Sequence, residues 1–254
     1  MPIIQSVERA LKIMDLFGEH TTELKITEIS ERMDLHKSTV HSLLKTLQEY
    51  SYISQNPENG KYRLGLKLAE RGNFVISSMD ISKVARKYLL ELSEKTGQTV
   101  HLGILEGRAG VYIDKVEGKQ SIIRYSRIGR RLPLHSTSIG KVLLAFQDSD
   151  EIQRLLKDFH YQQQTTRTIT NEAVFRKELE KIQQQSYAVD DQENEQGVRC
   201  AAVPIFNGKG QVLASISIST LIARVNDQEL SVFIDLLKTA CNELSEQMKY
   251  GYEN

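Results

Sequence analysis

The chain has 254 residues, 40% of them hydrophobic and 26% charged, which is the composition of a soluble globular protein with room for two domains. Its formal net charge is +0, so any nucleic-acid binding must depend on a local basic surface. No apolar run approaches the ~20 residues of a membrane span, and two cysteines do not make a disulfide framework. We therefore expect a cytoplasmic protein with no membrane partner.

The first 64 residues predict three helices followed by a β-hairpin. Apolar residues recur at helical spacing in 5–17 and in 26–33, so we expect one buried face on each helix. In the first helix that face consists of Val7, Ala10, Leu11, Met14 and Phe17. The segment NPENG, residues 56–60, separates two short alternating runs and is typical of a hairpin turn.

The third predicted helix, which follows the break at residues 34–36, has an unusual exposed face. Val40, Leu43, Leu44 and Leu47 share one side and are expected in the core. The opposite side carries hydroxyls, a histidine and lysines, and no acidic residue occurs before Glu49. We expect DNA contacts from Lys37, Ser38, Thr39, His41, Ser42 and Lys45, and from Lys61 and Arg63 on the hairpin. The alternative is a solvated surface helix whose N-cap is Ser38 or Thr39.

The order of these elements favours DNA binding over the alternative. Helix, short helix, three-residue break, acid-poor helix and hairpin together make a winged helix-turn-helix. We predict a DNA-binding domain at residues 1–65, a linking helix at 66–80 and a second domain at 81–254. The predicted partner is double-stranded DNA.

The second domain alternates predicted helices and strands. Strands are expected at 99–106, 111–116, 121–126, 198–206 and 211–220, and helices at 82–96, 137–147, 149–157, 171–185 and 227–248. Neighbouring strands joined by short turns favour antiparallel pairs, so we predict an α+β fold with a mostly antiparallel sheet.

Ordered segments along the whole chain resemble IclR-type bacterial transcriptional regulators. They include ITEISERMDLHKSTVHSLLKTLQEYSYI, GQTVHLGILEGRAGVYIDKV, SRIGRRLPLHSTSIGKVLLA, TRTIT, YAVDDQENEQGVRCAAVPIF and ASISIST. The resemblance implies a winged helix that dimerises on DNA, a linking helix and a C-terminal domain that binds a small organic acid or related metabolite. It also implies a homodimer or homotetramer, no cofactor and no enzymatic activity. Members of the family repress or activate transcription, and we expect a repressor.

The resemblance also implies an effector site in the C-terminal domain. Matching positions are Ser138, Ile139, Asp190, Cys200, Ser217 and Ser219. The family often has Cys or Ala where this chain has Ser136, and small residues where it has Ile139. Because a larger side chain shrinks the pocket, the identity of the effector does not carry over.

The residues themselves give the same site independent support. Ser215, Ser217 and Ser219 alternate with isoleucines, so their hydroxyls share one face of a strand and can donate to a carboxylate. Ser138 and Ile139 stand at a predicted helix start, where backbone N–H groups hold anions. Arg130 and Arg131 precede that helix and add positive potential. The alternatives are a half-exposed edge strand for the serines and a buried apolar filler for Cys200.

Three further hypotheses concern other chemistry. Ser138 and Lys141 form the S-x-x-K spacing of an acyltransferase or hydrolase, although the KTG at 95–97 precedes it and SDN is absent. His101, His135 and Cys200 are zinc-type ligands, but their spacing is scattered and we expect no metal. The arginine cluster from Arg124 to Arg131 is a second DNA patch, a solvated loop or a subunit contact, of which the last two are favoured.

Overall fold

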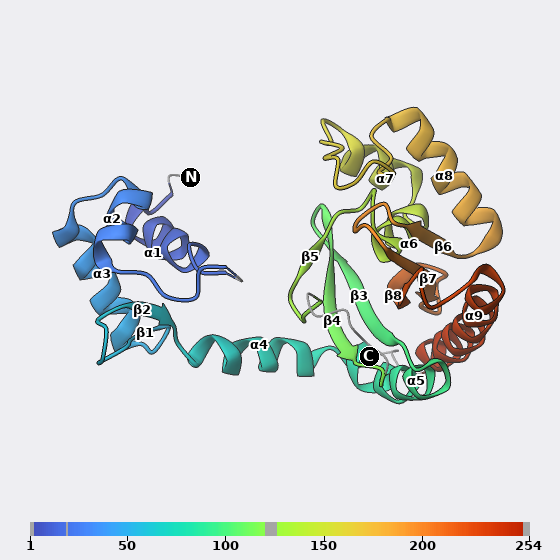
Figure 1. The fold of residues 1–254 in the computed structure, drawn as a ribbon, viewed down its shortest axis with the longest axis horizontal. Coiled ribbons are helices and arrows are strands. Elements are labelled where there is room, and N and C mark those ends of the chain that lie inside the picture. The colour runs from blue at the N-terminus through green and yellow to red at the C-terminus, as the bar shows by residue number, and fades with distance from the viewer. Residues whose placement is uncertain (1–2, 19, 120–125, 251–254) are drawn as a thin grey trace. The chain divides into compact units, whose positions relative to one another are not determined.

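The chain folds into two compact units, residues Met1–Ser78 and Met79–Asn254, in a computed structural model (Figure 1). The structure describes residues 3–18, 20–119 and 126–250. Within these ranges no helix combines the length and the apolar character that crossing a membrane requires.

The first unit has the predicted order of helices and hairpin. Its elements are α1 (Gln5–Asp15), α2 (Ile26–Met33), α3 (Lys37–Glu49), β1 (Ile53–Gln55), β2 (Tyr62–Leu64) and α4 (Lys67–Ser78). The strands β1 and β2 pair antiparallel, with Ser54 opposite Arg63. Side chains from α1, α2, α3 and the hairpin share one core, which includes Ile13, Ile29 and Leu44. The predicted helix-turn-helix and wing are therefore confirmed.

Two details of this unit differ from the sequence predictions. Val7 and Leu11 were expected in the core, but each is 53% exposed, because α1 turns Ile13 inward instead; Phe17, just after the helix, is buried as expected. The N-cap of α3 is His36, which makes no side-chain capping bond, so neither Ser38 nor Thr39 caps the helix. The hydroxyls on the first turn of α3 thus have no capping role.

The second unit is built on a six-stranded sheet with the order β5-β4-β3-β8-β7-β6, and every strand pair is antiparallel. The strands are β3 (Thr99–Glu106), β4 (Ala109–Val116), β5 (Arg131–Leu132), β6 (Ala188–Asp191), β7 (Val198–Phe206) and β8 (Val212–Leu221). The helices are α5 (Asp80–Thr96), α6 (Ser138–Ala145), α7 (Ser149–Leu156), α8 (Glu172–Gln185) and α9 (Asp227–Tyr250). The α+β prediction is confirmed. The pattern of residues did not predict β5 or β6, and residues 121–125 of the expected strand lie outside the described residues.

Helices cover both faces of the sheet (Figure 1). Side chains from α5 and α9 pack on the face that Ile216 and Ile218 supply, whereas α6, α7 and α8 form a second core on the other face. Strand alternation then turns Ser215, Ser217 and Ser219 toward the α6 side. Because β8 lies between β3 and β7, these serines are almost fully buried, and the edge-strand alternative is wrong.

The start of α6 lies very close to β3. A Cβ atom added at Gly103 would stand 2.8 Å from Cγ2 of Ile139, and one added at Gly140 would stand 2.4 Å from the carbonyl oxygen of Pro133. Real Cβ atoms do not approach other atoms that closely, so glycine at 103 allows the start of α6 to reach β3, and glycine at 140 allows α6 to pack against the segment that precedes it.

We predict that Gly103→Ala lowers the free energy of unfolding by about 1–3 kcal/mol, because the added methyl group forces Ile139 out of its place. Chemical denaturation followed by circular dichroism measures the change. Gly72→Ala is the control, since nothing lies within 4 Å of a Cβ atom there and a helical alanine is neutral or favourable. Equal stability of Gly103→Ala and the wild-type chain would contradict the close approach.

Candidate DNA-binding face and effector cavity

The exposed side of α3 carries the side chains that the sequence predicted for DNA contact. Lys37, Ser38, His41, Ser42 and Lys45 are exposed, and Thr39 is half-buried. On the opposite side Val40, Leu44 and Leu47 are buried, so the amphipathic pattern fixes which side faces outward. With no side-chain cap and no acidic residue in its first turn, the α3 N-terminus keeps its positive dipole end for an anion.

The hairpin that follows α3 has the form of a wing. Gly60 adopts a left-handed conformation, with φ of 69°, which lets the chain reverse between the strands. Arg63 on β2 is exposed, and its Nε donates to Ser54 Oγ at 3.2 Å, while Lys61 is half-buried. The half-buried Glu23 accepts amide hydrogen bonds from Asn59 and Asn56, which lower its pKa. This carboxylate offsets part of the positive charge of the wing.

A small cavity lies between the start of α6, the sheet and the turn after β6. Its volume is about 30 Å³, which is room for a water-sized molecule. The lining residues include Ser138, Ile139, Asp190, Cys200 and Ser219 from the predicted set. Ser217 is buried on the same face of β8, opposite His101 and Ala202, and does not line the cavity. Five of the six predicted effector residues are therefore brought together.

Polar side chains that were not predicted as effector ligands complete the cavity wall. They are His101, Tyr112, Ser126, Arg130, Thr137, Asn194 and Glu195. The alternation along β3 and β4 places His101 and Tyr112 on one face, but their meeting depends on strand register, which sequence alone does not supply. The two rings are stacked, with centroids 4.3 Å apart.

A line of hydrogen bonds crosses β7, β8 and β3 in the wall of the cavity. Cys200 Sγ donates to Ser219 Oγ at 3.2 Å, and Ser219 Oγ lies 3.4 Å from Nδ1 of His101. Burial, with the nearby charges of Lys115 and Arg130, lowers the pKa of His101 to about 3, so its imidazole is neutral. Burial also raises the pKa of the Cys200 thiol, which stays protonated. These groups are polar and uncharged at neutral pH.

Asp190 stands opposite the start of α6. Its Oδ1 accepts from the backbone N–H of Glu193 at 2.7 Å and of Asn194 at 3.2 Å. Burial and the neighbouring Glu193 raise the Asp190 pKa to about 7, although Lys141 lowers it in part. On the other side Thr137 caps α6 by accepting from the N–H of Gly140 at 3.1 Å.

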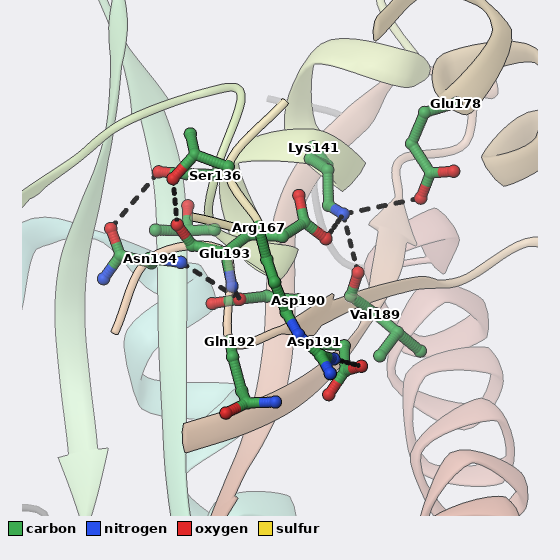
Figure 2. Close-up of polar contacts among 12 residues, drawn as sticks. Ser136, Lys141, Arg167, Glu178, Val189, Asp190, Asp191, Gln192, Glu193 and Asn194 are labelled. Atoms are coloured by element: carbon green, nitrogen blue, oxygen red, sulfur yellow. Dashed lines mark hydrogen bonds and ion pairs between the residues drawn. The ribbon is translucent and has the colours of Figure 1, made fainter. Parts of the chain in front are cut away.

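Lys141 is fully buried and is bound by three oxygen atoms (Figure 2). Its Nζ lies 2.6 Å from Glu193 Oε1, 2.6 Å from the Val189 carbonyl oxygen and 3.4 Å from Glu178 Oε1. An ammonium that donates to carboxylates in this way has no lone pair for accepting a proton from Ser138. The S-x-x-K hypothesis of a hydrolase or acyltransferase is therefore wrong.

The histidines and Cys200 do not assemble into a metal site. Among the described residues no group of three or more His, Cys, Asp or Glu side chains is placed to hold a metal ion. His135 is buried among Phe159, Tyr161 and Phe175, and its Nε2 lies 2.9 Å from the Gln162 carbonyl oxygen. Its surroundings are those of a structural histidine. Of the arginine cluster, Arg124 lies outside the described residues, and Arg131 donates to the Glu106 carbonyl oxygen.

Two family models match the chain, a helix-turn-helix domain of IclR type over residues 6–57 and the C-terminal domain of bacterial transcriptional regulators of IclR type over residues 73–246. The chain belongs to the IclR family of bacterial transcriptional regulators. The regulator XynR of Escherichia coli K12 is 57% identical over 250 residues, which are 98% of this chain and 99% of that protein. KdgR of the same organism is 40% identical over 97% of this chain and 94% of its own length.

Solved structures of the family have the same fold. The IclR protein of Thermotoga maritima superposes with a TM-score of 0.80 at 36% identity, covering 97% of this chain and 99% of its own. An IclR homologue from Microbacterium hydrocarbonoxydans, complexed with 4-hydroxybenzoate, gives 0.82 at 20% identity over 96% and 98% of the two chains. IclR-family members are DNA-binding regulators with an effector-binding domain, so this chain is a transcriptional regulator and not an enzyme.

The raised pKa of Asp190 has a consequence for stability. A carboxyl whose pKa is higher in the folded than in the unfolded chain favours folding only while it is protonated, so its ionisation costs stability as the pH rises from about 4 to about 7. We predict that Asp190→Asn, which stays neutral, gains stability relative to the wild-type chain between pH 5 and pH 8. Urea denaturation at both pH values measures the difference, and a difference that is constant with pH would contradict the buried neutral carboxyl.

Proposed function

We propose that this regulator binds its operator as a homodimer or homotetramer in the cytoplasm, through α3 and the wing, and senses a small carboxylate in the cavity beside α6. The proposed DNA contacts are Lys37, Ser38, Thr39, His41, Ser42, Lys45, Lys61 and Arg63. The proposed effector contacts are Ser138, Ile139, Asp190, Cys200 and Ser219, together with His101 and Arg130.

The exposed face of α3 carries the proposal for DNA. Hydroxyls and the imidazole reach base edges, while lysines meet phosphates, and no acidic side chain on the first three turns repels the duplex. Because the chain as a whole has no net charge, its attraction for DNA phosphates comes from the local positive charge on this face and on the wing.

The start of α6 supports a carboxylate ligand. The N–H groups of Ser138 and Ile139 at its start and the positive dipole end favour an anion, and Arg130 adds positive charge to the same wall. An IclR homologue of the same fold was solved in complex with 4-hydroxybenzoate, a small carboxylate, which supports this ligand class. Ile139 fills the space between Gly103 and Gly110, so a ligand larger than the present cavity must displace it. A calorimetric screen in which sugars or amines bind and organic acids do not would contradict this ligand class.

The exposed apolar side of α1 supports assembly. Val7 and Leu11, with Met14, Leu43 and Tyr52, line an apolar groove between α1 and α3. A second copy of the chain would cover such a surface, and two copies present two α3 helices to a two-fold operator. A bound effector shifts the equilibrium between arrangements of the two copies only if it has a different affinity for each.

We predict that Lys45→Ala weakens operator binding and reduces the slope of log affinity against log salt concentration by about 0.9, because one phosphate contact and its counterion release are lost. Fluorescence anisotropy at several salt concentrations measures the slope. Lys209→Ala is the matched control, since it removes the same charge from an exposed turn of the other unit. An unchanged slope for Lys45→Ala would remove Lys45 from the phosphate backbone.

We predict that Ser219→Ala raises the effector concentration needed for half-maximal response by about tenfold, because the effector loses a hydrogen bond to the cavity wall. A tenfold change corresponds to a loss of about 1.4 kcal/mol of binding free energy. Affinity for DNA without effector stays unchanged. Ser215→Ala is the control, since Ser215 shares the face of β8 but donates to the Val203 carbonyl oxygen and does not line the cavity. An unaltered dose response for Ser219→Ala would contradict the site.

A further inference from the structure

The turn Asp190–Asn194 forms one wall of the effector cavity. Asp190 and Asn194 line the cavity directly, and Glu195 follows them in the chain. The carboxylate of Asp190 accepts the N–H groups of Glu193 and Asn194, so its position depends on the shape of the turn. Ser136, next to α6, donates to Asn194 Oδ1 at 3.2 Å. Whatever fixes this turn also fixes the acidic side of the cavity.

Lys141 holds the turn from inside the domain. Its ammonium bonds the Val189 carbonyl oxygen before the turn and the Glu193 carboxylate within it (Figure 2). The same helix begins at Ser138 and Ile139, which line the opposite side of the cavity. The two walls of the cavity are thus tied together through one buried charge.

The segment 164–168, which contains the start of the TRTIT motif, holds the turn from the other side. The Thr168 hydroxyl is buried; it donates to the Glu193 carbonyl oxygen at 2.6 Å and accepts the N–H groups of Gln164 at 3.0 Å and Thr165 at 2.9 Å. One hydroxyl has one proton and two lone pairs, so all its bonding capacity is used. Thr165 Oγ1 also donates to the Gln192 carbonyl oxygen at 2.6 Å.

We propose that Thr168 is a positioning residue for effector recognition, which acts by holding the Asp190–Asn194 turn against the cavity through the Glu193 carbonyl. This inference rests on the proposed effector site beside α6. Thr168 does not itself line the cavity. Its hydroxyl supports the groups that do, in the way that outer hydrogen bonds orient the ligands of a binding site.

Thr168→Val tests this role, because valine has nearly the same shape and lacks the hydroxyl. The N–H groups of Gln164 and Thr165 lose their acceptor, and the Glu193 carbonyl oxygen keeps only the longer 3.4 Å bond from Thr165 Oγ1, so the turn loosens. Two readouts follow: amide hydrogen exchange of Glu193 and Asn194, and calorimetric titration of the full-length protein with acetate, lactate and 4-hydroxybenzoate. We expect at least tenfold faster exchange and about tenfold weaker binding of whichever acid the wild-type protein binds.

Two variants control for a general loss of structure. Thr166→Val makes the same substitution at an exposed position of the same segment and should leave both readouts unchanged. Thr168→Ser keeps the hydroxyl and should restore exchange and binding to within about twofold of the wild type, even if Thr168→Val folds poorly. Loss of binding in Thr168→Ser equal to that in Thr168→Val would show that the methyl packing matters instead, and would overturn the proposal.

The outcomes separate this inference from the proposed function. Binding of an acid by the wild type with equal affinity in Thr168→Val overturns the positioning role and leaves the effector site intact. Unchanged amide exchange at Glu193 and Asn194 overturns it without reference to any ligand. If the wild-type protein binds none of the acids, the carboxylate site fails first, and the inference fails with it.

Discussion

The buried ammonium of Lys141 is the interaction on which the effector domain depends. A charge removed from water is tolerated only when oxygen atoms surround it, and here Glu193, Glu178 and the Val189 carbonyl do so. The partners come from α8, from β6 and from the turn after it, so the hydrogen bonds of one charge join three segments to α6. Removing one partner of such a buried pair costs about 3–5 kcal/mol. That cost is the penalty of leaving the other charge buried and unpaired, and not the net stabilisation from the pair. The ion pair therefore constrains where these segments lie more than it stabilises the domain.

That constraint explains why polar residues from distant parts of the chain meet at one cavity. The start of α6 reaches the sheet where Gly103 leaves room, and the Asp190–Asn194 turn stands on the opposite side. Between them the wall is neutral His101 and Ser219, with Arg130 beside them. The surroundings are dry enough to raise the pKa of Asp190 to about 7, so the protonation state of the acidic wall changes near neutral pH. In the DNA-binding unit, by contrast, the charged side chains of α3 lie on the surface, and its exposed face carries no acidic residue before Glu49.

Local sequence patterns predicted most of the fold. The helical spacing of Val40, Leu44 and Leu47 and the NPENG turn sufficed for the winged helix, because both signals are local. Val7 and Leu11 were placed wrongly, since apolar spacing shows which side of a helix is apolar but not whether the chain itself buries that side. The two-residue β5 is too short for any periodicity. Ser217 was predicted with Ser219 as an effector residue, and His101 was not predicted to line the effector site. Which side chains line the cavity depends on strand order and register, which bring together residues more than a hundred positions apart.

We propose that this chain binds a specific DNA sequence through α3 and that its affinity for the DNA changes when a small acid binds. A fluorescence-anisotropy titration tests it most directly, with DNA from upstream of the protein's own gene and a scrambled duplex at the same fixed salt concentration. We expect tighter binding to the native fragment and a change in that affinity when an organic acid that the protein binds is added. Absence of binding to either duplex at low salt would contradict the assignment of α3 and the wing as the DNA-binding surface.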